Sequence, residues 1–136
     1  MKTYYPEVEH GIVNRATNTF FKYQGWPTVA RDEEGTLYVA SSSFRMFHVC
    51  PFGKTAMYIS KNEGRTWTPP IVINDTYLDD RDGGLLYAGG GRLILTWFTL
   101  PGNEIRGYYG WMQSRLADAE MKANKGMMEA VEMLPE

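Results

Sequence analysis

Apolar and polar positions along the chain fall into short runs that predict β-strands joined by tight turns. Residues 26–43 and residues 82–99 each contain an apolar run, a glycine turn and a second, more apolar run, which is the pattern of a β-hairpin. Placing Gly35 on Gly91, an offset of 56 residues, aligns the apolar positions of the two segments without gaps. The coinciding pairs are Val29 with Leu85, Leu37 with Leu93, and Val39 with Leu95. The sequence therefore predicts one hairpin that occurs twice.

Two further strands are expected between the hairpins, over residues 54–60 and residues 68–74. Pro69 and Pro70 stand near the start of the second of these strands. Because proline has no backbone N–H to donate, we expect this strand at the outer edge of the sheet. Four antiparallel strands in about 50 residues are the layout and the period of a β-propeller blade.

The C-terminal residues follow a different pattern. Residues 115–126 lack the turn glycine that a further repeat would need, and apolar positions from Met112 onward recur at helical spacing. A second short helix is expected over residues 127–133. We predict an all-β fold, with a partial β-propeller of about one and a half blades in residues 1–110. A helical tail or an inter-blade insertion is expected in residues 111–136, and this chain cannot close a propeller by itself.

Composition and charge narrow the classes of function. The net charge is −2 and no basic stripe is present, so we expect no nucleic-acid partner. No run of about 18 apolar residues occurs, so we expect no membrane partner. The N-terminus lacks the apolar segment of a secretory signal, which indicates a cytoplasmic protein, with secretion left open for a longer N-terminus. The single cysteine, Cys50, excludes an internal disulfide framework.

Aromatic residues are abundant: the chain holds four Trp, nine Tyr and six Phe. Aromatic side chains favour half-buried strand positions. They also line pockets that bind sugars and other small molecules. The composition therefore agrees with a sheet protein that carries an aromatic-lined binding site.

The stretch S60-K-N-E-G-R-T-W67 between the third and fourth predicted strands has the chemistry of a built turn. Side-chain oxygens of Ser60 and Asn62 can accept hydrogen bonds from nearby backbone N–H groups. Gly64 can adopt a positive φ without steric cost. Trp67 offers a large apolar plate for packing. None of these roles requires catalysis.

The same stretch resembles the Asp-box of the sialidase (neuraminidase) superfamily, Ser-x-Asp-x-Gly-x-Thr-Trp, with Asn62 in place of the aspartate. The resemblance covers about residues 25–98, including WPTVARDEEGTLYVAS before the box and DDRDGG with GGGRLILTWF after it. HVCPFGK together with DDRDGG is similar to bacterial BNR-repeat proteins of sialidase-like type. The resemblance implies a propeller whose boxes are structural and lie on the face away from the active site.

In that family, the loops at the opposite end of the strands form the site. On this chain the resemblance points to residues 25–26, 45–53 and 79–84, with Trp26 as a substrate-binding residue. Sialidases use a tyrosine nucleophile, an acidic residue for proton transfer and three arginines that bind the substrate carboxylate. The first of these arginines stands two residues before a proline, a place that Gly25 occupies here. That departure makes a sugar other than sialic acid a plausible ligand.

The resemblance places the acid/base aspartate of the family in residues 43–53, yet these residues hold no carboxylate. His48 is the candidate catalytic group there, because an imidazole with a pKa near 6.5 suits proton transfer. Arg45 is a candidate ligand for a substrate anion or for hydroxyls. The structural alternative is that His48 caps a loop and that Arg45 pairs with a nearby aspartate.

The densest charged cluster is D79-D-R-D82. Asp80 and Asp82 are candidates for acid/base catalysis, while Asp79 and Arg81 are candidates for binding substrate and orienting the carboxylates. The alternative is a solvated turn with weak local ion pairs. We expect no metal and no cofactor: His48 with Cys50 does not complete a zinc site, and the acidic run lacks the spacing of a calcium loop.

Two classes of function follow from the resemblance, each with a carbohydrate ligand. The first is a sialidase-like, exo-acting glycoside hydrolase, in which this chain carries only part of the active site. Its tyrosine nucleophile would come from later blades, so the chain alone is expected to be inactive. The second is a non-catalytic carbohydrate-binding propeller. A truncated, inactive fragment that forms homo-oligomers through open sheet edges is the remaining alternative.

Overall fold

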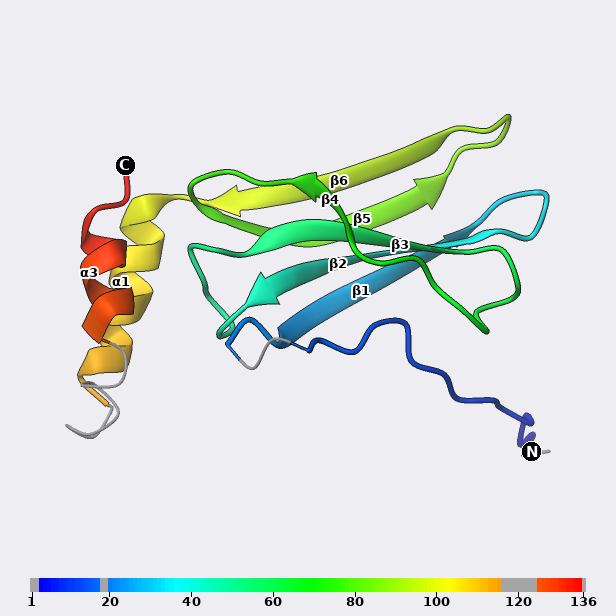
Figure 1. Cartoon of the computed structure of the whole chain (residues 1–136), viewed down its shortest axis with the longest axis horizontal. Helices are drawn as coiled ribbons and strands as arrows, with labels where there is room; N and C mark the ends of the chain where they lie inside the picture. The colour runs from blue at the N-terminus through cyan, green and yellow to red at the C-terminus, as the bar shows by residue number, and fades with distance from the viewer. Residues whose placement is uncertain (1–2, 18–19, 116–124, 136) are drawn as a thin grey trace.

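The computed structural model describes residues 3–17, 20–115 and 125–135, and these residues are mostly β-strand. The first sheet has four antiparallel strands in the order β1-β2-β3-β4, and the second has two, β5 and β6 (Figure 1). The strands are β1 (Tyr23–Arg31), β2 (Leu37–Arg45), β3 (Lys54–Ser60), β4 (Ile71–Asn74), β5 (Asp79–Tyr87) and β6 (Leu93–Leu100). The helices are α1 (Gly102–Gln113) and α3 (Lys125–Glu132). The expected all-β class is confirmed, with two short helices added to it.

The first sheet agrees with the strands expected from the sequence. Both hairpins are present, and β3 covers residues 54–60 as predicted. The short strand β4 pairs only with β3 and lies at the outer edge, directly after Pro69 and Pro70. The prolines delay the start of β4 until Ile71, because they cannot donate the hydrogen bonds that a ladder needs.

The two hairpins are repeats in structure as well as in sequence. The offset of 56 that joins Gly35 to Gly91 also joins the first residue of β1, Tyr23, to the first residue of β5, Asp79. It joins the start of β2 to the start of β6 in the same way. The pairing of β1 with β2 shifts register between Gly25 and Thr28, and the pairing of β5 with β6 shifts between Arg81 and Gly84, which are the repeat-equivalent residues.

The second sheet packs face to face on the first, with β5 crossing β1, β2 and β3 (Figure 1). The sheets approach closely at Gly83, because a Cβ there would lie 3.1 Å from Thr55 and 3.3 Å from Ala40. The Thr28 hydroxyl donates a hydrogen bond of 2.6 Å to the carbonyl of Gly83. A glycine therefore permits the two sheets to approach at the point where their bulges meet.

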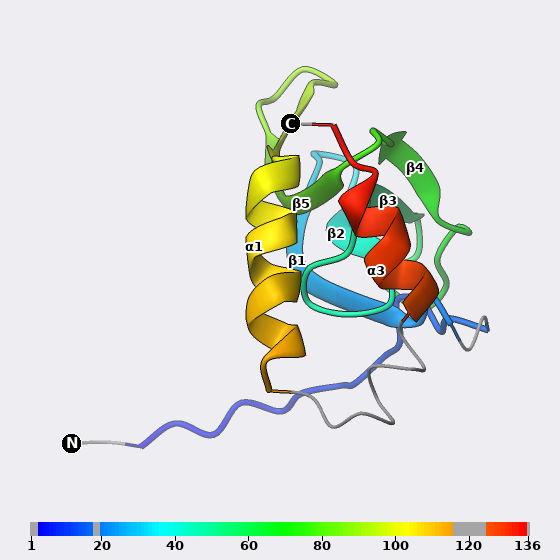
Figure 2. The same cartoon turned by 90° about the vertical axis from the view of Figure 1, so that its left-hand side faces the viewer.

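The helices pack together across the ends of the strands (Figure 2). Helix α1 begins at Gly102, earlier than the expected helical tail from residue 111, and α3 confirms the second helix. Most of the helix expected over residues 115–126 lies outside the described residues. Buried side chains of both helices form one apolar cluster with the loop after β2: Val49, Cys50, Ile105, Tyr109, Met127 and Val131. No described helix is long and apolar enough to cross a membrane.

The N-terminal segment, residues 3–17, runs along the face of the first sheet that points away from β5 and β6 (Figure 1). Val13 packs there against a second apolar cluster built on Val39, Ala56 and Tyr58. The rest of the segment is largely exposed. The first sheet is thus covered by a sheet on one face and by a single extended segment on the other.

The turn after β3 has the expected construction. The Ser60 hydroxyl accepts from the Gly64 N–H at 2.9 Å, and the Asn62 carbonyl oxygen accepts from the Thr66 N–H at 2.9 Å. Gly64 has a φ of 82°. Trp67 donates its indole N–H to the Gly64 carbonyl at 3.0 Å and packs on the second apolar cluster. These hydrogen bonds join residues of the same turn, so the role of the turn is structural.

Candidate functional site

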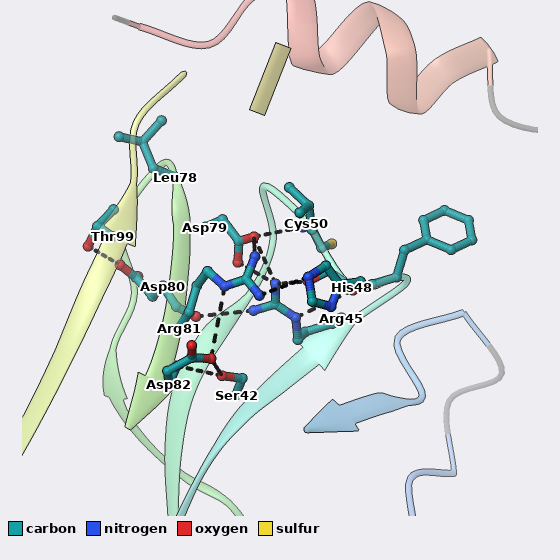
Figure 3. Close-up of polar contacts among 12 residues, drawn as sticks. Ser42, Arg45, His48, Cys50, Leu78, Asp79, Asp80, Arg81, Asp82 and Thr99 are labelled. Atoms are coloured by element: carbon teal, nitrogen blue, oxygen red, sulfur yellow. Dashed lines mark hydrogen bonds and ion pairs between the residues drawn. The ribbon is translucent and has the colours of Figure 1, made fainter. Parts of the chain in front are cut away.

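The three segments that the sequence pointed to lie together at one end of the sheets, where β2 ends and β5 begins. Figure 3 shows two of them, the loop after β2 and the start of β5. Strand β3 runs from this end to the turn that starts at Ser60, so the built turn lies at the opposite end. Arg45 comes from the end of β2, His48 from the following loop, and Asp79 from the start of β5. Trp26 reaches them from the bulge of β1.

A buried ion pair between Arg45 and Asp79 forms the centre of the cluster. Nη2 of Arg45 lies 2.6 Å from Oδ1 and 2.8 Å from Oδ2 of Asp79, and both side chains are fully buried. The backbone N–H of Cys50 donates to Oδ2 of the same carboxylate at 2.9 Å. Burial raises the pKa of Asp79, and the positive charge of Arg45 opposes that shift.

Arg45 uses its other nitrogens to hold the loop that follows β2. It donates to the carbonyls of Phe47 at 3.4 Å, His48 at 2.6 Å and Asp80 at 3.2 Å. All three guanidinium nitrogens are therefore engaged within the chain. The geometry agrees with the structural alternative for Arg45, pairing with a nearby aspartate, and gives no support to ligand binding by this residue.

Arg81 is held much more loosely than Arg45. Its Nη1 lies 3.4 Å from Oδ2 of Asp79 and its Nη2 lies 3.5 Å from Nε2 of His48. Its Nε has no hydrogen-bond partner in the described part of the chain and stands 4.0 Å from Oδ1 of Asp82. The side chain is nevertheless 7% exposed, so this buried cation retains donor capacity that nothing in the described residues uses fully.

Aromatic rings pack around the Arg81 guanidinium. Its Cζ lies 5.0 Å from the centre of the Trp26 ring and 5.8 Å from the centre of the Phe98 ring. Both distances are within the range of cation–π attraction. Trp26 also contacts the His48 ring edge to face, with centroids 5.0 Å apart. These contacts fix the Trp26 ring over the cluster.

His48 is an exposed imidazole beside two cations. Burial of the ring and the charges of Arg81 and Arg45 lower its pKa from the ordinary 6.5, so the ring is neutral at pH 7. Because a guanidinium can only donate, the Arg81 contact makes Nε2 the acceptor and leaves the proton on Nδ1. In this tautomer His48 can donate a hydrogen bond from Nδ1, while Nε2 faces Arg81.

Asp80 differs from its neighbours, because it points away from the two arginines toward β6 (Figure 3). Its carboxylate is fully buried and accepts from the Thr76 N–H at 2.7 Å, the Thr76 hydroxyl at 3.1 Å and the Thr99 hydroxyl at 2.7 Å. A carboxylate with three partners inside the protein is suited to fixing the chain before β5. The structure therefore separates Asp80 from the other candidate residues.

Asp82 and Trp26 flank an open cavity of about 320 Å³ between the two sheets. Its walls come from the two bulges: Trp26, Pro27, Thr28, Asp82, Gly83 and Gly84. Asp82 is half-buried, and its backbone N–H donates to the Ser42 hydroxyl at 2.7 Å. In the described residues its carboxylate makes only long contacts, 3.5 Å from that hydroxyl and 4.0 Å from Nε of Arg81. Asp82 is thus the carboxylate of the cluster that remains free to meet a ligand.

Two residues near the candidate site were missed by sequence reasoning. Ser42 orients the backbone of Asp82, and Phe98 covers Arg81. They are repeat-equivalent, since the offset of 56 joins residue 42 to residue 98. The aligned hairpins could have identified both residues, because Ser42 pairs with Gly25 and Phe98 pairs with Arg81 beside the two bulges. The run of three serines ending at Ser43, inside an otherwise apolar strand, is a second signal.

No group of three or more His, Cys, Asp or Glu side chains in the described residues is arranged to hold a metal ion. Comparison of the chain with protein-family models, with curated proteins and with solved structures finds no significant match.

Proposed function

We propose that the chain forms successive blades of a β-propeller of the sialidase type. Three features support this: the meander order of the first sheet, the face-to-face packing of β5 on that sheet, and a repeat whose bulges coincide. The turn that begins at Ser60 adds a fourth, because its hydrogen bonds fulfil the structural role that the resemblance implies. Blades packed face to face around an axis are the arrangement of propellers.

The function that we propose is carbohydrate binding in the cavity between Trp26 and Asp82. The volume of about 320 Å³ is at the lower end of the range for small-molecule sites, which suits one sugar ring. The Trp26 ring provides a surface for the apolar face of a sugar, and the Asp82 carboxylate accepts hydrogen bonds from its hydroxyl groups.

The strongest support for sugar binding comes from the two bulges. The bulges of β1 and β5 place an aromatic ring and an under-bonded carboxylate on the rim of the same cavity. A bulge re-aims a side chain out of the regular alternation of a strand, and such features gather at binding sites. Neither Trp26 nor Asp82 is needed to complete the apolar clusters of the fold.

The experiment is a titration of the full chain with a panel of neutral and acidic monosaccharides, followed by NMR or calorimetry. We expect at least one sugar to bind, and we expect Trp26→Ala and Asp82→Asn each to weaken it by about tenfold or more, the loss of about 1.4 kcal/mol. Trp111→Ala is the matched control, because Trp111 is 54% exposed on α1 and does not line the cavity. Equal binding by the Trp26 variant would refute the site.

A second candidate function is sialidase-like glycoside hydrolysis, with this chain supplying part of the active site. Arg81 favours it, because Arg81 is the repeat-equivalent of Gly25, the place at which the family carries a carboxylate-binding arginine. Arg81→Gln would then weaken binding of sialic acid and leave a neutral hexose unaffected. A fluorogenic sialoside provides the second test, and the chain alone is expected to give no turnover, since the nucleophile would come from later blades.

A further inference from the structure

In the described part of the chain, two sheet faces have no covering sheet. The open face of the second sheet carries exposed apolar side chains: Leu86 is 59%, Ile94 is 49% and Phe98 is 48% exposed. The open face of the first sheet, which residues 13–17 cover in part, carries Val29, which pairs with Val39 and is 63% exposed. Exposed apolar patches of this kind mark interaction surfaces.

The repeat shows how the open face of the second sheet is used elsewhere in the same chain. Its central positions, Thr96 and Phe98, are the repeat-equivalents of Ala40 and Ser42. Ala40 and Ser42 are fully buried beneath β5. The second sheet therefore exposes the face that, in the first sheet, packs against a neighbouring sheet.

The open face of the first sheet is equivalent to the face that β5 buries against that sheet. Pro27 and Val29, on β1, are the repeat-equivalents of Gly83 and Leu85 on β5. Gly83 is buried against the first sheet, whereas Pro27 and Val29 are both exposed. Within the described residues, the first-sheet face that carries Ala40 packs against the β5 face that carries Gly83. The repeat-equivalent faces, which carry Thr96 and Val29, pack against no other sheet in this part of the chain.

The N-terminal segment covers the open face of the first sheet incompletely. Asn14 donates a hydrogen bond of 3.3 Å to the Tyr58 hydroxyl, and Val13 contacts the apolar cluster. Cavities of about 330 Å³ and about 220 Å³ remain between this segment and the sheet. Protein interiors are close-packed, so a cover that leaves such space is easier to displace than a packed sheet.

We infer that a second copy of this chain packs the open face of its β5–β6 sheet on the open face of the β1–β4 sheet, displacing residues 13–17. The contact repeats between chains the sheet-on-sheet packing that exists within each chain. Because the two faces differ, the association is head to tail, and its repetition closes a ring when the rotation between sheets permits. The inference rests on the repeat and stands whether or not the cavity binds a sugar.

The test is sedimentation of the full chain over a range of concentrations, with one acidic substitution on each face. Ile94→Asp alters the open face of the second sheet, and Val29→Asp alters that of the first. Met133→Asp is the control, because Met133 is 84% exposed after α3 and belongs to neither face. We expect wild type and the control to associate into one defined oligomer and both face variants to be monomers, with circular dichroism showing that all are folded.

A mixture of the two face variants distinguishes head-to-tail packing from other modes. Each Ile94→Asp chain retains an intact first-sheet face, and each Val29→Asp chain retains an intact second-sheet face. The mixture is therefore expected to form a dimer and nothing larger. A monomeric wild type at all concentrations would overturn the inference. So would association of either face variant alone, which indicates pairing of like faces or of strand edges, or a mixture that stays monomeric.

Discussion

Trp26 and Asp82 occupy the same position of two successive hairpins, and both have a positive φ of 50°. Neither is glycine, and the left-handed region costs an ordinary residue about 1–2 kcal/mol. The two residues face the same cavity. Strain that occurs twice at equivalent bulges and opens on a cavity agrees with a binding role for both side chains.

The strain at Asp82 leads to the first prediction. Asp82→Gly removes the cost of the positive φ, while losing only the long contacts of its carboxylate with Ser42 and Arg81. We expect the free energy of unfolding to rise by about 0.5–1 kcal/mol and sugar binding to fall by at least about tenfold. Glu63→Gly is the control: Glu63 has a φ of 58° in the distant turn, so its replacement is expected to stabilise without affecting binding. Unchanged binding by Asp82→Gly would exclude the carboxylate from the site.

The buried pair of Arg45 and Asp79 gives the second prediction. Arg45→Met leaves a carboxylate buried without its cation, which is expected to lower the free energy of unfolding by about 3–5 kcal/mol in a urea titration. Adding Asp79→Asn to that variant is expected to cost less than the sum of the single changes, because the two groups are coupled. Asp75→Asn breaks an exposed pair with Lys54 and is expected to cost no more than about 1 kcal/mol. Additive effects would contradict the pairing.

Gly53 gives the third prediction, because it packs on the same ion pair. A Cβ at this position would lie 2.4 Å from Nη1 of Arg45 and 2.5 Å from Oδ1 of Asp79, neither of which has room to move. We expect Gly53→Ala to destabilise the chain by about 1–3 kcal/mol. Gly107→Ala is the opposite case, because Gly107 lies exposed in α1 with nothing within 4 Å. That change is expected to stabilise by about 0.5–1 kcal/mol. Thermal unfolding measures both variants. A melting temperature that does not fall in Gly53→Ala, or does not rise in Gly107→Ala, would contradict the corresponding prediction.

The fourth prediction concerns pH and His48. Its pKa in the folded chain is lower than the ordinary 6.5, because burial, Arg81 and Arg45 disfavour the charged ring. The folded state therefore binds this proton less readily than the unfolded state, and its contribution is present above pH 6.5 and lost as the pH falls below it. Melting temperatures from about pH 7.5 to about pH 5 should fall less steeply in His48→Gln. His10→Gln, in the N-terminal segment, is the control, and an unchanged slope in His48→Gln would contradict the prediction.

The strands were predictable because their signals are local. Glycine turns, alternating apolar positions and the prolines before β4 give the two hairpins and the outer edge from the sequence alone. The turn at Ser60 was predictable for the same reason, since its hydrogen bonds join residues a few positions apart. The choice of the three loops came from the family resemblance. The strand order explains why two of them meet, because it brings the end of β2 and the start of β5 to the same end of the sheets.

Helix α1 was not predictable in the same way. It contains glycine at positions 102, 107 and 110, a composition that disfavours isolated helices. Its stability comes from burying Ile105 and Tyr109 against the loop after β2, and the Tyr109 hydroxyl donates to the Val49 carbonyl at 3.0 Å. These partners are far apart in sequence, so no local pattern reveals them.

The different roles of the charged residues are also set by tertiary contacts, which the sequence does not show. Arg45, Asp80 and Asp82 are similar candidates in the sequence, yet the first two are consumed by internal bonds and only Asp82 remains under-bonded. Composition identifies a charged cluster, but the direction in which each side chain points decides its role. For Asp80 that direction is set by Thr76 and Thr99, which carry no signal of their own.

Cys50 is the single thiol of the chain, and it is fully buried beneath Ile105, Tyr109 and Met127. A thiol reagent can reach it only when the helices lift from the ends of the strands or the loop after β2 opens. The rate at which the native chain is labelled therefore reports the opening of this region, separately from global unfolding. Because the Cys50 N–H also bonds Asp79, the same rate would sense how firmly the charged cluster is closed. The protein thus carries its own reporter of local opening beside the candidate site.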